Sequence, residues 1–224
     1  MNYKLLAVGL VLLVACASDV ETSGGGGEGG TLEACTGYED AEPAAPITLR
    51  FVNETLLDVY LEASCDQLAF DIQPDAGADG AYYGYVGGAC QQSCEALQTQ
   101  SQVQCEACAP STQHIPPQSS IEVTWDGRAQ RQVEMAAECY FDELTGAQDC
   151  PQIFKAPAGE YSLSIAAYNA CDGQGAPCEC DANGLCFGTA SGMAAFVQPT
   201  SFTLPTDTVE YVLDVCAFGC AEPN

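Results

Sequence analysis

The sequence predicts an all-β fold, an antiparallel β-sandwich whose strands are separated by cysteine-rich insertions. Short segments in which apolar and polar residues alternate recur along the chain, as expected for half-buried strands. Clusters of Pro, Gly, Asp and Asn separate these segments. Most of the 15 cysteines lie between them. The clearest alternating segments are residues 47–52, 57–62, 121–125, 163–167 and 208–215.

The first strands follow Pro43 and Pro46, which mark the start of the folded domain. Residues 47–52 alternate, and a turn at 53–55 leads to residues 57–62, so the two segments are expected to form a hairpin. In the second segment, Asp58, Tyr60 and Glu62 face one way, and Leu57, Val59 and Leu61 the other. Further strands are expected near residues 68–72 and 81–86.

Three insertions are expected, at about residues 87–114, 137–153 and 170–190. The first has no Pro or Gly between residues 90 and 108, and it is predicted to be helical or irregular. On a helix, Cys90 and Cys94 share a face, so this insertion is a candidate for a short disulfide-closed helical hairpin.

The second half of the chain continues the strand pattern and carries two short motifs. A proline-led strand ends in Thr-Trp-Asp-Gly-Arg at residues 124–128, and Pro-Ala-Gly-Glu-Tyr at 157–161 precedes the next strand. This part of the chain resembles a bacterial immunoglobulin-like (Ig-like) module of the flagellar hook-capping and intracellular proteinase inhibitor type. The resemblance implies an Ig-like sandwich, here with a lengthened linker between the motifs. Residues 193–197 and 202–204 are further strand candidates.

The N-terminus has the layout of a secretory signal peptide, with Lys4, an apolar run at residues 5–14 and small residues before Cys16. The apolar run is too short to span a bilayer. Leu13, Val14, Ala15 and Cys16 resemble the lipobox of bacterial lipoproteins. The resemblance implies cleavage before Cys16, which would then carry a diacylglycerol and an N-acyl chain such as palmitate. With Ala17 rather than Asp after the cysteine, it also implies the outer membrane of a Gram-negative bacterium.

These observations divide the chain into three parts. Residues 1–15 are the predicted signal peptide, residues 16–44 the lipidated cysteine and a flexible glycine-rich tether, and residues 45–224 the sandwich domain. The net charge of the whole chain is −26, and removing Lys4 leaves four basic and 31 acidic residues, 4 − 31 = −27. Such a charge excludes nucleic acid as a partner, so membrane contact is expected through the lipid anchor alone.

Lipidation of Cys16 would leave an even number of cysteines in an oxidising compartment, where disulfides are the expected state. The spacing does not determine their pairing. A zinc site is not predicted, because the chain has one histidine and no second C-x2-C pair. The fourteen disulfide candidates are Cys35, Cys65, Cys90, Cys94, Cys105, Cys108, Cys139, Cys150, Cys171, Cys178, Cys180, Cys186, Cys216 and Cys220.

Candidate functional residues are few, and no cofactor is implied. Oxygen ligands for a weak calcium site occur in one loop, at Asp172, Glu179, Asp181 and Asn183, without the spacing of a known calcium loop. Tyr82, Tyr83 and Tyr85 are candidate binding residues. No catalytic residue is predicted. The single histidine, His114, is expected in a loop near Ser111, Ser119 and Ser120, and the chain has no G-x-S-x-G or H-E-x-x-H motif.

The expected function is therefore non-enzymatic, that of a binding or structural module of the cell envelope with a protein or glycan partner. Two alternatives stay open. A proteinase-inhibitor-like module would present an exposed loop closed by disulfides. A carboxylate-dependent extracytoplasmic hydrolase would hold two acids in one concave cleft.

Overall fold

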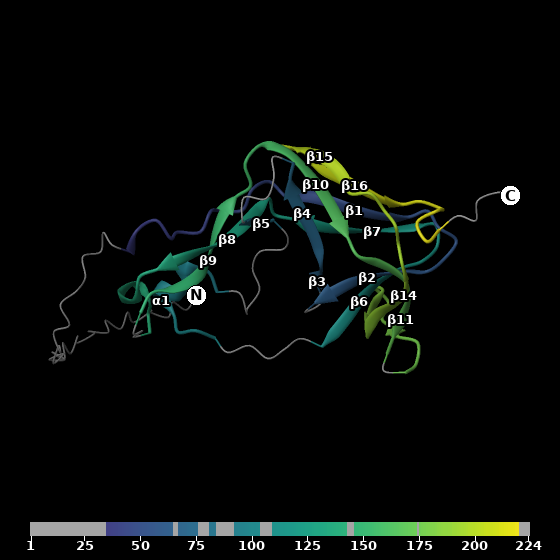
Figure 1. The fold of residues 1–224 in the computed structure, drawn as a ribbon, viewed down its shortest axis with the longest axis horizontal. Helices are drawn as coiled ribbons and strands as arrows, with labels where there is room; N and C mark the ends of the chain where they lie inside the picture. Colours follow the sequence, from purple (N-terminus) through teal and green to yellow (C-terminus); the bar gives the residue numbers. More distant parts are fainter. Residues whose placement is uncertain are drawn as a thin grey trace, which may run out of the picture. The chain divides into compact units, whose positions relative to one another are not determined.

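The computed structural model describes residues 35–64, 67–75, 81–83, 92–103, 109–142, 146–173 and 175–219, which belong to one compact unit. These residues form mostly β-strands, arranged in four sheets (Figure 1). The predicted all-β fold with disulfides is confirmed. Within these ranges, no helix is both long and apolar enough to cross a membrane.

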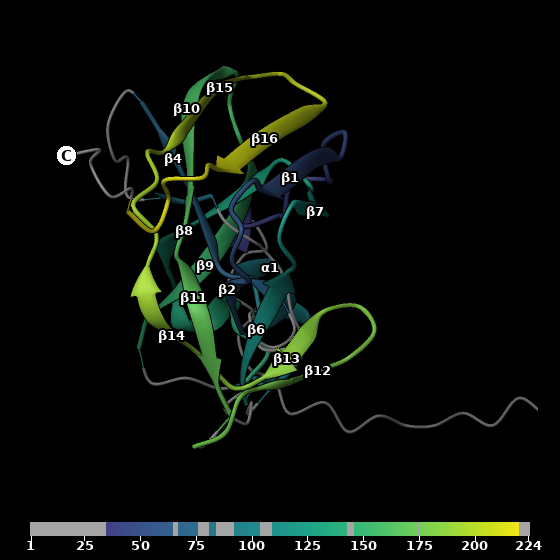
Figure 2. The same ribbon diagram turned by 90° about the vertical axis from the view of Figure 1, so that its right-hand side faces the viewer.

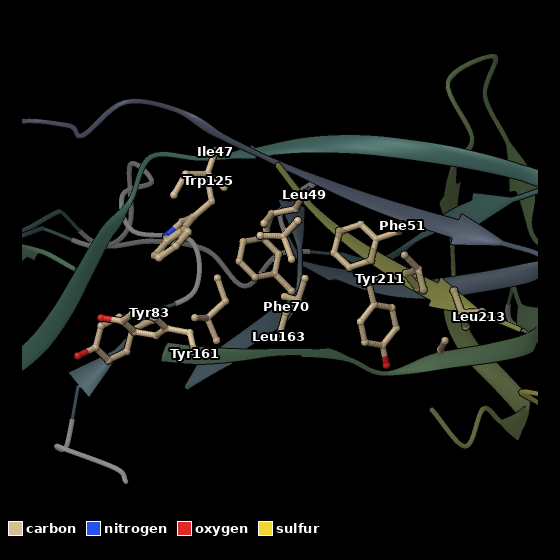
Figure 3. Packing of buried hydrophobic residues seen from close by; sticks show 14 of the residues in the cluster. Ile47, Leu49, Phe51, Phe70, Tyr83, Trp125, Tyr161, Leu163, Tyr211 and Leu213 are labelled. Carbon is tan, nitrogen blue, oxygen red and sulfur yellow. The ribbon is translucent and has the colours of Figure 1, made fainter. Parts of the chain in front are cut away.

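Two three-stranded sheets enclose the main hydrophobic core. In the first sheet, β1 (Ile47–Asn53) lies between β7 (Ser119–Trp125) and β16 (Thr208–Leu213). In the second, β10 (Gly159–Ile165) lies between β4 (Phe70–Pro74) and β15 (Thr200–Leu204). Alternate residues of β1 are buried, as the period of a strand requires. Figure 3 shows the buried side chains of both sheets meeting in one interior, including Leu49, Phe51, Trp125, Leu163 and Tyr211.

The first sheet is mixed rather than purely antiparallel. β1 pairs antiparallel with β7 but parallel with β16, from Thr48 opposite Thr208 to Asn53 opposite Leu213. The parallel pair joins segments about 160 residues apart in the sequence. Arg50 of β1 donates a hydrogen bond to Glu210 of β16 across this pair. Alternation along each strand cannot reveal such a pairing.

The expected hairpin between residues 47–52 and 57–62 is wrong, because β1 and β2 (Val59–Ser64) lie in different sheets. β2 belongs to a third sheet, seen in Figure 2, where it pairs with the strands on either side of it. The third sheet runs in the order β12 (Glu179–Cys180), β13 (Leu185–Phe187), β6 (Pro110–Ile115), β2, β11 (Ala167–Asp172) and β14 (Thr189–Ala194), with β3 (Gln67–Leu68) also pairing with β2.

Asn53 explains why the chain crosses between sheets at this point instead of folding back. Its side chain is fully buried, and its Nδ2 donates to the carbonyl oxygens of Leu57, Ile115 and Pro116 at 2.9, 3.0 and 3.0 Å. Its Oδ1 accepts from the backbone N–H and the hydroxyl of Thr55. The Asn53 side chain therefore links the end of β1 by hydrogen bonds to the segment that precedes β2 and to the end of β6.

The fourth sheet consists of β5 (Ala81–Tyr82), β8 (Arg128–Met135) and β9 (Gln148–Lys155). The β8–β9 pair runs unbroken from Arg128 opposite Lys155 to Met135 opposite Gln148. The expected insertion at 137–153 therefore extends too far, since it contains six of the eight residues of β9. The other two expected insertions likewise contain most of β6, and half of β11 together with β12 and β13. These strands are rich in polar residues and alternate weakly, so their pattern resembles that of loops.

A second, smaller core cluster joins the short helix α1 (Cys94–Thr99) and the 3-10 turn η2 (Ala137–Cys139) to the fourth sheet. Cys94 bonds Cys150 of β9, so it does not close a helical hairpin within its own insertion. Ser93 caps α1 by accepting a hydrogen bond from the N–H of Ala96. α1 is the one α-helix in the described ranges, and residues 104–108 lie outside them.

The folded domain begins earlier than the expected tether boundary at residue 44. Cys35 bonds Cys139, a link across 104 residues. The N–H of Ala41 donates to the Ile153 carbonyl at 3.1 Å, and the N–H of Ala44 donates to that of Asp126 at 3.0 Å. Residues 35–44 therefore pack against the domain and do not belong to the predicted tether.

The two sequence motifs form corners of the sandwich. Trp125 is buried, and its indole N–H donates to the Arg128 carbonyl at 3.0 Å. Asp126 binds the Arg128 side chain at 2.7 Å, and Gly127 supplies the positive φ of +68° that this tight turn requires. In the second motif, the buried Tyr161 donates its hydroxyl proton to the Pro157 carbonyl at 2.8 Å. The motif residues thus have structural roles.

Candidate functional site

The single histidine lies on a strand of the third sheet, not in the loop expected from its neighbouring prolines. His114 is on β6, directly opposite Tyr60 of β2, and the two rings stack with centroids 5.0 Å apart. The Nε2 of His114 lies 2.7 Å from Oδ1 of Asp58. The carboxylate therefore fixes the imidazole, and the imidazole packs against the phenol ring.

Tyr168 extends this arrangement to a third strand. It lies on β11 directly opposite Tyr60, on the side of β2 away from His114. Its hydroxyl is hydrogen-bonded to Glu62. Because registered partners share a face, His114, Tyr60 and Tyr168 form a row across three strands. Val59 and Leu61 point the opposite way and are fully buried, so this row faces away from the core.

We call this feature the Tyr60 platform; it consists of Tyr60, His114 and Tyr168 with the flanking Asp58 and Glu62. The tyrosines, His114 and Glu62 are half-buried, whereas Asp58 is exposed. At one end, Ala194 of β14 lies opposite Tyr168. At the other, the Gly184 carbonyl accepts from the N–H of His114 at 2.8 Å. The neighbouring residues at both ends of the row therefore have small side chains, and they do not cover the rings from these positions.

The charges around the platform are negative. Asp58 and Glu62 flank Tyr60 along the chain: Asp58 immediately precedes β2, two residues before Tyr60, and Glu62 lies on β2, two residues after it. The four basic residues that follow Lys4 lie on the first and fourth sheets: Arg50 on β1, Arg128 and Arg131 on β8, and Lys155 on β9. Arg50 and Arg128 are paired with carboxylates, at 3.1 Å from Glu210 and 2.7 Å from Asp126.

Both tyrosines of the platform are held in the neutral form. Burial, with a contribution from the nearby Asp58 charge, raises the pKa of Tyr60 above its usual 10.0. The hydrogen bond to Glu62, together with that carboxylate's charge, raises the pKa of Tyr168. At neutral pH both phenols are therefore uncharged rings with a hydrogen-bond donor at the rim.

The tyrosines expected to bind a partner have a different role or lie outside the described residues. Tyr83 is buried in the main core, where its ring meets those of Tyr161 and Phe154 edge-on at 5.5 and 6.1 Å. Tyr83 is therefore a packing residue. Tyr82 is on β5, opposite Gln130, and Tyr85 is outside the described ranges.

The weak calcium candidates serve local turns. Oδ1 of Asp181 accepts from the N–H groups of Asn183 and Leu185 at 2.8 and 2.9 Å. Oδ1 of Asp172 accepts from the N–H of Gly175, and Glu179 is exposed on β12. In the part of the chain that the structure describes, no three His, Cys, Asp or Glu side chains are placed to hold a metal. The sequence pattern reflects Asx turns, which use the same residues.

The serines near His114 do not form a nucleophile–base pair with it. Ser111 is three residues away on the same strand, so the alternation of β6 places the two side chains on opposite faces. Ser111 is buried, and its hydroxyl has no hydrogen-bond partner among the residues that the structure describes. The hydroxyl of Ser120 accepts from Arg50, and Ser119 lies opposite Asn53.

One pocket carries two acids. It has a volume of about 390 Å³, and Asp75 and Glu160 are among its lining residues. The N–H of Asp75 donates to the Glu160 carbonyl at 2.9 Å, which brings the two residues together at the end of β4.

The disulfides found agree with an oxidising environment. Cys171–Cys178 and Cys180–Cys186 close two short loops, and Cys216 is also disulfide-bonded. With Cys35–Cys139 and Cys94–Cys150, every cysteine in the described ranges is oxidised. The cysteines outside those ranges are Cys16, Cys65, Cys90, Cys105, Cys108 and Cys220, so the predicted lipidation site is among them.

The alternation of residues 57–62 predicts that Asp58, Tyr60 and Glu62 share one face, but it does not distinguish them from the polar residues of other strands. His114 and Tyr168 join them only through strand pairing. Comparison of the chain with protein-family models, with curated proteins and with solved structures finds no match.

Proposed function

We propose that this chain is a lipid-anchored binding module of the bacterial cell envelope, tethered through Cys16 and binding its partner at the Tyr60 platform. The lipobox-like Leu13-Val14-Ala15-Cys16 supports the anchor and, with Ala17, an outer-membrane location. The oxidised cysteines support export, because disulfides persist in oxidising compartments. The role is non-enzymatic.

The observation that carries the binding role is a solvent-facing row of rings whose side chains are already fixed. Asp58 holds His114, and Glu62 holds Tyr168, so little side-chain entropy remains to be lost when a partner binds. Tyrosine offers a large apolar face with a polar rim, which suits it to binding surfaces. A tether ending before residue 35 would keep the platform near other envelope components and raise its effective concentration toward them.

The binding role is tested with the Cys16→Ser chain, which lacks the lipid, in sedimentation with isolated envelope fractions of the producing bacterium. Tyr60→Ala should lower the bound fraction, because it removes the central ring of the row. Phe196→Ala is the matched control, since Phe196 is 87% exposed and lies outside the platform. Equal sedimentation of Tyr60→Ala and the unsubstituted chain would contradict the proposal.

The anchor has a separate test. Intact mass after bacterial expression should show loss of residues 1–15 and addition of acyl chains. Cys16→Ser should abolish the acyl mass. An unmodified Cys16 at the mature N-terminus would refute the anchor but leave the platform proposal intact.

A second candidate function is supported by the loop between Cys171 and Cys178. It is a short loop closed by a disulfide with an exposed tip at residues 175–177, which is what a proteinase inhibitor requires. Titration against a panel of serine and cysteine proteases tests it. Full residual activity of every protease at excess inhibitor would exclude this function.

The hydrolase alternative has one place to be tested, the pocket lined by Asp75 and Glu160. Two carboxylates at one pocket are the minimum for acid–base glycoside hydrolysis. Turnover of oligosaccharides that is lost in both Asp75→Asn and Glu160→Gln would establish it. Absence of turnover in the unsubstituted chain across a substrate panel would remove it.

A further inference from the structure

We infer that the Tyr60 platform takes positively charged side chains, the Lys and Arg residues of an extended basic segment on a protein partner. This inference rests on the proposed binding function and specifies its ligand. It is carried by the position of carboxylates beside half-buried, solvent-facing rings, together with the distribution of basic residues over the strands.

The charge arrangement selects a cation. Asp58 and Glu62 flank Tyr60, while the four basic residues that follow Lys4 lie on β1, β8 and β9, none of which belongs to the third sheet. The Asp58 side chain is 53% exposed. With a predicted mature charge of 4 − 31 = −27, the field of the whole domain also attracts cations. A basic segment would therefore be drawn to the domain and held at these two carboxylates.

The rings add a second, short-range attraction. A Lys ammonium or an Arg guanidinium over the face of a tyrosine is attracted by the ring quadrupole, by about 0.5–2 kcal/mol depending on solvation. Tyr60 and Tyr168 are neutral rings at pH 7, because burial, with a contribution from Asp58, raises the pKa of Tyr60 and the hydrogen bond to Glu62 raises that of Tyr168. The neighbouring acids supply the opposite charge for the ligand.

The spacing of the acids predicts the spacing of the bases. Residues two apart on a strand face are separated by about 7 Å, so Asp58 and Glu62 lie about 13–14 Å apart along the chain with Tyr60 midway. An extended peptide has the same repeat. Bases at positions i and i+4 would therefore reach the two carboxylates, while position i+2 lies over Tyr60.

A neutral glycan is the competing ligand, since sugars also stack on tyrosine. It would use the rings and the hydrogen-bonding rims, but it would gain nothing from the negative potential. The charge distribution therefore favours the basic peptide, and the glycan becomes an outcome of the test.

The test uses the Cys16→Ser chain and three synthetic probes in calorimetric titration. The first is a nine-residue Gly/Ser/Thr peptide with lysines four positions apart. The second is the same peptide with both lysines acetylated, and the third is a panel of neutral hexasaccharides. Titrations are made at about 20 mM and about 300 mM salt, because screening weakens exposed charge pairs.

Variants separate the site from the general charge. Tyr60→Ala and the pair Asp58→Asn/Glu62→Gln should each lower the affinity for the lysine peptide by about tenfold. The matched control is Glu134→Gln/Asp149→Asn, which removes the same two charges where these residues face each other on β8 and β9. The control should change the affinity by less than about twofold.

The outcomes distinguish the basic peptide as ligand from the more general binding function of the platform. Salt-sensitive binding of the lysine peptide that depends on Tyr60 and on the acid pair confirms the inference. Equal loss in the control pair, or equal binding of the acetylated peptide, overturns it. A hexasaccharide that binds through Tyr60 in place of the peptide refutes the basic partner but keeps the binding function. If no probe and no envelope fraction responds to Tyr60→Ala, both fail.

Discussion

Substitution of Asn53 should be among the most damaging single changes in the domain, although the residue lies in a turn-forming position of the sequence. Its amide has two hydrogens shared among the carbonyls of Leu57, Ile115 and Pro116, and its oxygen accepts two bonds from Thr55. Asn53→Ala therefore removes all five of these contacts in a fully buried place, and they count as about four hydrogen bonds because two hydrogens serve three carbonyls. At about 1 kcal/mol each, the loss is about 4 kcal/mol of unfolding free energy.

The aspartate variant tests the reasoning more sharply than the alanine variant. Asn53→Asp keeps the acceptor for Thr55, but it turns an oxygen toward three carbonyl oxygens and buries a charge. It should therefore destabilise at least as much as Asn53→Ala at neutral pH. Guanidinium unfolding with intact disulfides measures this. With a slope of about 4 kcal/mol/M, the midpoint should fall by about 1 M. An Asn53→Asp domain within about 0.5 kcal/mol of the unsubstituted chain would refute this account.

Three further predictions concern stability. Replacing Cys35 and Cys139 by serine opens a link across 104 residues and should cost about 4–5 kcal/mol, visible as a lower melting temperature; an unchanged one would refute it. Burial raises the pKa of Asp40 above 3.8, so its stabilising contribution is present below that value and lost as pH rises through the folded pKa. Asp40→Asn should therefore melt higher than the unsubstituted chain at pH 7, and this gain should vanish toward pH 3. Burial likewise raises the pKa of Tyr211, so stability falls as pH rises past about 10; Tyr211→Phe should flatten this fall, and parallel curves would contradict it.

Much of the sandwich could be predicted because its strands bury alternate residues. The inward positions of β1, at Leu49 and Phe51, are apolar, while Thr48 and Arg50 between them are polar. The same signal failed at β6, β8 and β9, where polar side chains occupy most positions on both faces. β6 and β8 are inner strands of their sheets, yet each contributes a single buried residue, Ile115 and Ala129, to the main core, so their sequences resemble loops.

Disulfide pairing and the start of the domain could not be predicted for a different reason. Cys94 lies near Cys90 in the sequence, yet it bonds Cys150, because α1 packs against β9 in the second core cluster. Cys35 follows a glycine-rich stretch that looks like a tether, yet it reaches Cys139. Local spacing carries no information about which distant segment will lie within bonding distance.

The sequence by itself determined the fold class, the negative charge and the motif at Cys16, because composition and alternation are local properties. It also placed Asp58, Tyr60 and Glu62 on one strand face. Only the tertiary structure decided that His114 and Tyr168 lie on either side of Tyr60, since strand register is set by contacts between segments more than 50 residues apart. The same long-range packing buries Tyr83 in the core, whereas the Tyr60 platform lies on the solvent-facing side of the third sheet.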